Sequence, residues 1–346
     1  MIKGDLRSVV CRTNVQFARM VEAAILPFPD GRLYLAYSEG ERADHIDGGM
    51  PEGNIRIMGR WSPDEGESWS APFVVKDFDG TPNAMEPSFL HLTTGQVLQT
   101  FMERATYTQS GDSFAGMRIL KSYSDNDCAT WSEPEEITDY GSMFFTTNDR
   151  LLSLSTGRVI LPAVIGPNLT SVRAWLSDDQ GISWRAGTGA VHAPQGISYG
   201  YPIAAELSDG RVALFLVNST GRMHIAQSND GGETWSEVDE TGIEPCPAPF
   251  MVRRLPASTD LLLVWNHHTQ RTNLSIAISH DDAQSWTTFR VIEAQDRWPL
   301  ERTWCYPSLA FMNNYAHLTY YERSADPTTK ARFDLISRRL PLDSIR

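Results

Sequence analysis

SNDGGETW, residues 228–235, consists of residues typical of a tight turn followed by a tryptophan, and the chain contains four further versions of it. These versions are SPDEGESW (62–69), SDNDCATW (124–131), SDDQGISW (177–184) and SHDDAQSW (279–286). The tryptophans that end the five octapeptides are separated by 62, 53, 51 and 51 residues. A nearly fixed period of this size is typical of an array of similar supersecondary units.

The residue types of the octapeptide each have a structural use. The Asp side chain can accept N–H bonds of its own turn, the Gly supplies a positive φ, and the Trp is expected to be buried between neighbouring sheets. Two copies depart from this pattern: Asn126 and Cys128 stand at the Asp and Gly positions of one, and Ala283 at the Gly position of the other. We expect these departures to weaken single turns without changing the fold.

A second repeat leads from an apolar stretch through a turn into a short alternating strand. It occurs at FPDGRLYLAY (28–37), LTTGQVLQTF (92–101), LSTGRVILPA (154–163), LSDGRVALFL (207–216), PASTDLLLVW (256–265) and FMNNYAHLTY (311–320). Each unit then combines a β-hairpin with a third strand that ends at the octapeptide and a fourth strand after its Trp. The sequence therefore predicts an all-β fold, a six-bladed β-propeller with four-stranded antiparallel blades, as a single domain over residues 1–346.

The sixth unit lacks the octapeptide, which bears on how the ring closes. We expect residues before about 15 to supply the outer strand of this unit, because closure removes exposed sheet edges.

Composition excludes several classes of partner. The chain has 346 residues, a net charge of -13 and a sequence pI near 5.1, and it has no clustered Lys and Arg, so neither nucleic acid nor an anionic membrane surface is an expected partner. No apolar run approaches the roughly 18 residues of a membrane span. The N-terminal residues lack the apolar segment of a signal peptide, which predicts a cytoplasmic protein, or a secreted one if a leader was removed.

Cysteine spacing and known motifs give no sign of a cofactor. The four cysteines, Cys11, Cys128, Cys246 and Cys305, lie far apart without a CxxC pair, which argues against a zinc site and a disulfide framework. No HExxH, EF-hand loop or P-loop is present, so we expect no obligatory cofactor and no metal.

The octapeptide SxDxGxTW resembles the Asp-box, or bacterial neuraminidase repeat, and five copies in six units resemble the sialidase superfamily over nearly the whole chain. That superfamily includes sialidases, other exo-glycosidases, polysaccharide lyases and non-catalytic propellers. The resemblance therefore implies the fold, and the reaction has to be argued from the site.

In such a propeller the ligand lies over the centre, where the innermost strands begin. Counting back nine residues from each turn glycine gives Glu22, Glu86, Asn148 and Tyr201, and the apolar register adds Ala248 and Tyr306. Polar side chains at positions where a buried strand would ordinarily carry Val or Ile indicate a ligand site. The alternative is a water-filled channel lined by polar groups.

Three segments are similar to sialidase segments. CYPSLAFMNNYAHLTYYE (305–322) implies Tyr306 as nucleophile, NHHTQRTNLSIAIS (266–279) implies Arg271 as a carboxylate-binding arginine, and LAYSEGERADHID (35–47) implies Asp47 or Asp44 as the acid/base.

The match to sialidases is incomplete. The first sialidase arginine falls on Val21 or Glu22, the second falls near Asn218, and the glutamate that pairs with the nucleophile falls on Tyr201. A sugar carboxylate would lose two bidentate partners and would be repelled by Glu22 and Glu86. We therefore expect a substrate other than sialic acid.

Two carboxyls that flank a sugar are the usual apparatus of glycoside hydrolysis, one as acid and one as nucleophile or base. Glu22 and Glu86 begin adjacent blades, and Arg19, Arg104 or Arg150 would pair with them if they were only structural. The sequence predicts an exo-acting glycoside hydrolase of a terminal sugar. Its predicted catalytic residues are Glu22, Glu86, Tyr306 and Asp47, and its predicted carbohydrate-binding residues are Arg271, Tyr201, Asn148, His267, His268 and Trp304.

Two other classes stay open. A uronate lyase would use His267 or His268 with Tyr306 and Arg271 to abstract a C5 proton, although adjacent residues on a strand point to opposite faces, so that at most one histidine enters the centre. A non-catalytic glycan-binding propeller is the third class.

Overall fold

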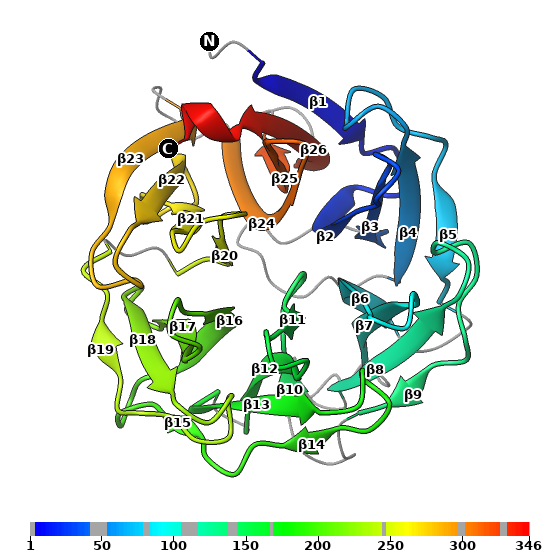
Figure 1. Ribbon diagram of the computed structural model, residues 1–346. Helices are drawn as coiled ribbons and strands as arrows, with labels where there is room; N and C mark the ends of the chain where they lie inside the picture. Colours follow the sequence, from blue (N-terminus) through cyan, green and yellow to red (C-terminus); the bar gives the residue numbers. More distant parts are fainter. Residues whose placement is uncertain are drawn as a thin grey trace.

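The computed structural model describes residues 4–41, 54–78, 83–104, 117–137, 144–166, 169–243, 247–295, 302–325 and 331–345. These residues form strands arranged in a ring of sheets around a centre, with one short 3-10 helix, η1 (Leu342–Ser344), at the end of the last blade (Figure 1). No helix in these ranges is long and apolar enough to cross a membrane.

Each blade is an antiparallel sheet that runs outward in chain order. Blade one contains β2 (Arg19–Pro27), β3 (Leu33–Gly40), β4 (Ile55–Ser62) and β5 (Phe73–Lys76). Blade two contains β6 (Asn83–His91), β7 (Val97–Arg104), β8 (Met117–Ser124) and β9 (Glu135–Glu136). Blade three contains β10 (Phe144–Phe145), β11 (Leu152–Ser153), β12 (Val159–Ile165), β13 (Ser171–Ser177), β14 (Arg185–Ala186) and β15 (Val191–His192).

The second half of the ring repeats this arrangement. Blade four contains β16 (Tyr199–Glu206), β17 (Val212–Asn218), β18 (Met223–Ser228) and β19 (Asp239–Glu240). Blade five contains β20 (Met251–Arg254), β21 (Leu261–Asn266), β22 (Leu274–Ser279) and β23 (Thr287–Glu293). Blade six contains β24 (Arg302–Met312), β25 (Tyr315–Ser324), β26 (Arg332–Pro341) and, as its outer strand, β1 (Leu6–Cys11).

The first strand of the chain closes the ring. β1 pairs antiparallel with β26, from Leu6 opposite Arg339 to Cys11 opposite Leu335, and the two strands lie side by side in Figure 1. This confirms that residues before about 15 supply the outer strand of blade six. Pairing the first strand with the last removes an open edge that would otherwise invite association.

The core lies between the blades. The second strands of blades one, two, four and five, β3, β7, β17 and β21, are buried along their whole length. A strand covered on both faces by neighbouring sheets needs apolar residues at nearly every position, which explains the continuous runs at LYLAY (33–37) and VALFLV (212–217).

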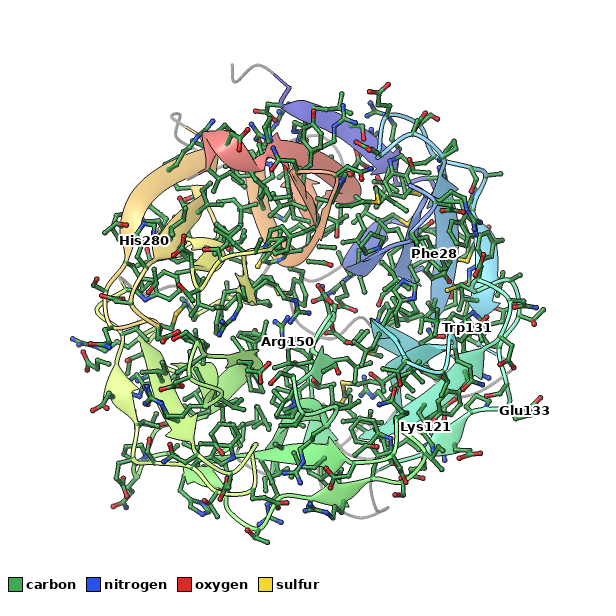
Figure 2. All side chains as sticks on the ribbon, in the orientation of Figure 1. Phe28, Lys121, Trp131, Glu133, Arg150 and His280 are labelled. Atoms are coloured by element: carbon green, nitrogen blue, oxygen red, sulfur yellow. The ribbon has the colours of Figure 1, made fainter. Side chains whose placement is uncertain are left out.

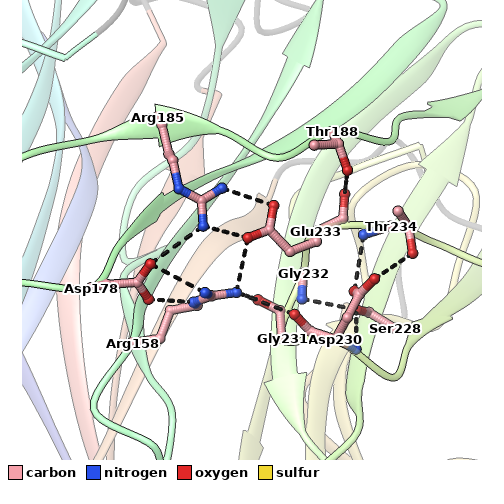
Figure 3. A network of polar contacts seen from close by, with 10 residues as sticks. All are labelled: Arg158, Asp178, Arg185, Thr188, Ser228, Asp230, Gly231, Gly232, Glu233 and Thr234. Carbon is pink, nitrogen blue, oxygen red and sulfur yellow. Dashed lines mark hydrogen bonds and ion pairs between the residues drawn. The ribbon is translucent and has the colours of Figure 1, made fainter.

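Each octapeptide lies between the third and fourth strands of its blade, as predicted. In SNDGGETW, Asp230 Oδ1 accepts the N–H of Thr234 at 2.9 Å, and Ser228 Oγ accepts the N–H of Gly232 at 2.8 Å (Figure 3). The copies that lack glycine keep the same backbone, because Cys128 has a φ of 60° and Ala283 a φ of 69°. Left-handed φ costs a side chain with a Cβ about 1–2 kcal/mol, which is the reason to expect these two turns to be weaker.

The expectation that the repeat tryptophans are buried is wrong for four of the five. Trp286 is 8% exposed, whereas Trp69, Trp131, Trp184 and Trp235 are half-buried. The octapeptides form turns at the end of a third strand, where one side of the indole packs on the sheets and the other side meets solvent.

The octapeptides also join consecutive blades. The residue after the motif Asp is left-handed in every copy and contacts the inner hairpin turn of the preceding blade. Thr93 donates its N–H to Gln180 Oε1 at 2.9 Å, and Ser208 donates its N–H to Asp282 Oδ1 at 2.9 Å. In Figure 3 the guanidinium of Arg158 from blade three plays this part, because it donates to the carbonyl of Gly231 at 3.2 Å.

Candidate functional site

The inner strands of four blades carry the same backbone irregularity. Glu22, Glu86, Tyr201 and Tyr306 have φ values of 58°, 57°, 55° and 56°, and each lies within a register shift of its inner hairpin. A bulge of this kind redirects a side chain, and left-handed residues other than glycine are found where the surrounding structure enforces them. The predicted site residues of these four blades therefore occupy equivalent positions.

Blade three departs from this rule. The left-handed residue is Asp149, with a φ of 57°, one position after the Asn148 that the nine-residue count selects. The count is wrong here because the inner strand of blade three is interrupted: β10 and β11 are two short pieces, and the residues between them leave the sheet. Asn148 is fully buried.

Glu22 and Glu86 are buried carboxyls, 6% and 3% exposed. Arg19 NH2 lies 3.3 Å from Glu22 Oε1 and forms an ion pair with it, and the backbone N–H of Asn148 donates to Glu86 Oε2 at 2.7 Å. Burial raises the pKa of Glu86 well above its usual range, and the charge of Glu22 raises it further, against the opposing effects of Asn148, Arg150 and Arg19. Burial and Glu22 therefore both favour the protonated form of Glu86.

Tyr306 lies among the same groups. Burial raises the pKa of its phenol well above 10, as do Tyr201, Glu86 and Glu22, while Arg271 opposes the shift. The Arg271 guanidinium is 5.9 Å from the centre of the Tyr306 ring, and its NH1 donates to the hydroxyl of Tyr321 at 3.1 Å. The structure thus brings together one residue from each of five blades. They are Glu22 of blade one, Glu86 of blade two, Tyr201 of blade four, Arg271 of blade five and Tyr306 of blade six.

The two histidines have other contacts. The ring of His267 lies 5.3 Å from that of Trp265 and 6.0 Å from that of Phe289, which belongs to the outermost strand of blade five. His268 is exposed, and its Nδ1 accepts the N–H of Gln270 at 3.2 Å. These contacts place the ring of His267 beside Trp265 and Phe289 of its own blade.

Trp304 supports the site from behind. Its indole is buried and donates to Glu322 Oε2 at 2.9 Å, and that carboxylate also receives NH2 of Arg7 from β1 at 2.6 Å. Its backbone N–H donates to the carbonyl of Arg271 at 2.9 Å. In this structure Trp304 therefore holds the backbone of Arg271 in place. Asp47 and Asp44, the predicted acid/base candidates, lie outside the described residues.

Sequence reasoning missed the role of the polar segment TTNDRL, residues 146–151. It is buried throughout and contains Arg150 at the centre of the ring (Figure 2). The signal was present in the sequence, because the corresponding inner strands of the other blades are more apolar, but the count of nine treated Asn148 as one more strand position.

A ring of antiparallel sheets, Asp-box turns at its rim and a polar centre define a propeller of the sialidase-like superfamily. The chain belongs to the family described as BNR repeat-like domain, which matches residues 31–318.

Solved structures with the same fold are known. A protein of unknown function from Dyadobacter fermentans is 18% identical over the whole of both chains, with a TM-score of 0.76. The NanB sialidase of Streptococcus pneumoniae is 13% identical over 98% of this chain and 71% of its own, with a TM-score of 0.79. The intramolecular trans-sialidase of Ruminococcus gnavus is 14% identical over 96% of this chain and 98% of its own, with a TM-score of 0.74. At these identities the likeness establishes the fold alone.

Proposed function

We propose that this protein is an exo-acting glycoside hydrolase that releases a terminal sugar other than sialic acid from a glycan or oligosaccharide. The observation that carries the proposal is the meeting of two buried carboxyls, Glu22 and Glu86, with Tyr306 where the inner strands begin. Burial and Glu22 favour the protonated form of Glu86, which is the asymmetry that acid catalysis of glycoside cleavage requires.

In the proposed reaction Glu86 donates its proton to the glycosidic oxygen as the bond from that oxygen to the anomeric carbon breaks. The leaving group departs as an alcohol, and Glu22, ion-paired with Arg19, faces the positive charge that develops on the sugar ring. In an inverting reaction Glu22 then accepts a proton from the attacking water. In a retaining one it accepts the proton of Tyr306 as the tyrosine oxygen attacks the anomeric carbon; water then displaces that oxygen, giving its proton to the Glu86 carboxylate, while Glu22 returns the proton to Tyr306. The anomeric configuration of the first product distinguishes the two.

The comparisons support a carbohydrate ligand without naming it. A leech intramolecular trans-sialidase of the same fold, 13% identical and with a TM-score of 0.76, binds 2,7-anhydro-Neu5Ac. In the present chain Arg19 is already paired with Glu22, and Glu22 would repel a sugar carboxylate. These features favour a sugar different from that of the sialidases.

The test is turnover of a panel of aryl glycosides, with an aryl sialoside included, by the wild type and three variants. Glu86→Gln and Glu22→Gln keep the shape and remove the ionisation, so each should lower turnover by orders of magnitude with a nearly unchanged melting temperature. Glu240→Gln is the matched control, because Glu240 is an exposed residue paired with Arg222 at the rim. Near-wild-type turnover in both site variants would overturn the proposal.

Uronic-acid oligosaccharides belong in the same panel. A product with the ultraviolet absorbance of an unsaturated uronate would identify a lyase instead. The mechanism that uses a histidine, Tyr306 and Arg271 would then replace the one that uses Glu22 and Glu86.

A further inference from the structure

The segment 146–151 of blade three lies at the centre of the ring, and five of its six side chains are polar although they are buried. Thr147, Asn148 and Arg150 are 0% exposed and Asp149 is 5% exposed. In Figure 2, Arg150 lies at the centre of the ring. A buried guanidinium is costly unless its N–H groups and its charge are used, so its position needs a reason.

The segment is held by blades other than its own. On the blade two side, Asp149 donates its N–H to the carbonyl of Pro87 at 3.0 Å, and Arg150 donates its N–H to Ser88 Oγ at 2.9 Å. On the blade one side, Asn148 Nδ2 donates to the carbonyl of Ala23, the neighbour of Glu22, at 2.6 Å. The backbone of Asn148 is therefore fixed against both blades that carry the carboxyls.

Blades five and six hold the other side. Arg150 NH2 donates to the carbonyl of Phe250 at 3.0 Å, and Arg253 NH2 donates to Asp149 Oδ1 at 2.9 Å. Ser308 Oγ donates to Asp149 Oδ2 at 2.8 Å. Asp149 thus contacts Arg253 and Ser308, while Arg150 donates NH1 to the carbonyl of Asn148 at 2.7 Å, the residue whose N–H holds Glu86.

Several charged or titratable groups face Glu86 from the surrounding elements. They are Glu22 and Arg19 on β2, Arg150 on the segment, and Cys305 and Tyr306 on β24. Burial and Glu22 favour the protonated carboxyl, whereas Arg150, Arg19 and the Asn148 N–H favour the carboxylate. Burial lowers the pKa of Arg150 to about 10, so Arg150 is still a cation at neutral pH.

We infer that the segment 146–151 is the positioning element of Glu86, in which the Asn148 N–H fixes one carboxyl oxygen and the Arg150 guanidinium stabilises the carboxylate left after proton donation. The inference rests on the proposed function only in naming Glu86 as the acid. An acid held solely by burial and a like charge would keep its proton, and a fixed cation and a fixed N–H lower the free energy of the state that forms when the proton leaves. Arg150 and Asn148 are positioning residues, since they act through Glu86.

The experiment titrates Glu86 directly, by the infrared carboxyl band of protein labelled with ¹³C-glutamate, assigned by its loss in Glu86→Gln. Arg150→Met removes the charge, and should raise the titration midpoint by about one pH unit, the scale of one buried charge in the protein interior. Arg150→Lys keeps the charge and should restore most of the shift. Arg253→Met is the matched control, because it removes an arginine that contacts Asp149, and it should leave the midpoint in place.

An unchanged midpoint in Arg150→Met, or an equal shift in Arg253→Met, would overturn the inference. If Arg150→Met does not fold, Asn148→Ala serves instead, because it removes the contact with Ala23 that fixes the Asn148 N–H. This variant should also raise the titration midpoint of Glu86, and an unchanged midpoint would overturn the inference. The band reports the carboxyl and not turnover. A shifted midpoint in a protein that cleaves no glycoside would therefore defeat the proposed function alone, and with a substrate the alkaline limb of kcat/KM should move with the band while KM stays constant.

Discussion

His317 makes the stability of the ring depend on pH. It is fully buried on β25, opposite Arg339 of β26, near the contact between blade six and the first octapeptide. Burial lowers the pKa of His317 from 6.5 to about 4, while Glu65 raises it and Arg339 lowers it. The folded protein therefore keeps this imidazole neutral under conditions in which the unfolded chain protonates it.

The sign and the size follow from the two pKa values. A folded pKa below the unfolded one means that the stability is fully present above about pH 6.5 and is lost as the pH falls toward 4. The difference of about 2.5 corresponds to roughly 3 kcal/mol when the loss is complete, at about 1.4 kcal/mol for each pKa unit. Between about pH 7 and about pH 5, the loss should be on the order of 2 kcal/mol.

Urea unfolding of the wild type and of His317→Gln at several pH values measures this contribution. The variant cannot titrate at this position, so its stability deficit relative to the wild type should shrink by on the order of 2 kcal/mol between about pH 7 and about pH 5. A deficit for His317→Gln that stays constant with pH would refute the reasoning.

Three further outcomes are expected. Trp286→Ala should cost about 3–5 kcal/mol, the scale of a fully buried aromatic, and Trp235→Ala clearly less, because its indole is half-buried; thermal melts that rank them the other way would contradict the packing described. Ala283→Gly should raise stability by up to about 1 kcal/mol, since it relieves a left-handed φ of 69°, and a lower melting temperature would count against that strain. Purified protein should not hydrolyse an aryl sialoside, and robust turnover would show that the arginines were aligned wrongly.

The ring of blades follows from the sequence because its signals are local and repeated. The Asp-box turn, the glycine of the inner hairpin and the period between tryptophans each constrain a few neighbouring residues, and five copies reinforce one another. The outer strand of blade six was predictable for a different reason: a missing fourth strand leaves an open edge, and the remaining unassigned segment was the N-terminus.

The bulge positions of the inner strands were predictable only where the blades repeat. The nine-residue count found Glu22, Glu86 and Tyr201 because their hairpins share one bulge, and the apolar register found Tyr306. The count missed the left-handed residue of blade three by one position, because the inner strand there is interrupted. Contacts between units far apart in sequence decide such cases, and a repeat pattern does not contain them.

The segment of blade three that departs from the repeat is also the segment that contacts Glu86. In other blades the inner strand also donates single N–H groups to a neighbouring blade: Ile25 donates to Ser308 Oγ at 3.1 Å and Glu86 to Ser38 Oγ at 3.1 Å. Breaking the inner strand into β10 and β11 frees the N–H of Asn148 for Glu86 and that of Arg150 for Ser88, because these groups no longer belong to a sheet ladder. The local departure from the repeat is thus what allows blade three to hold the Glu86 carboxyl of blade two.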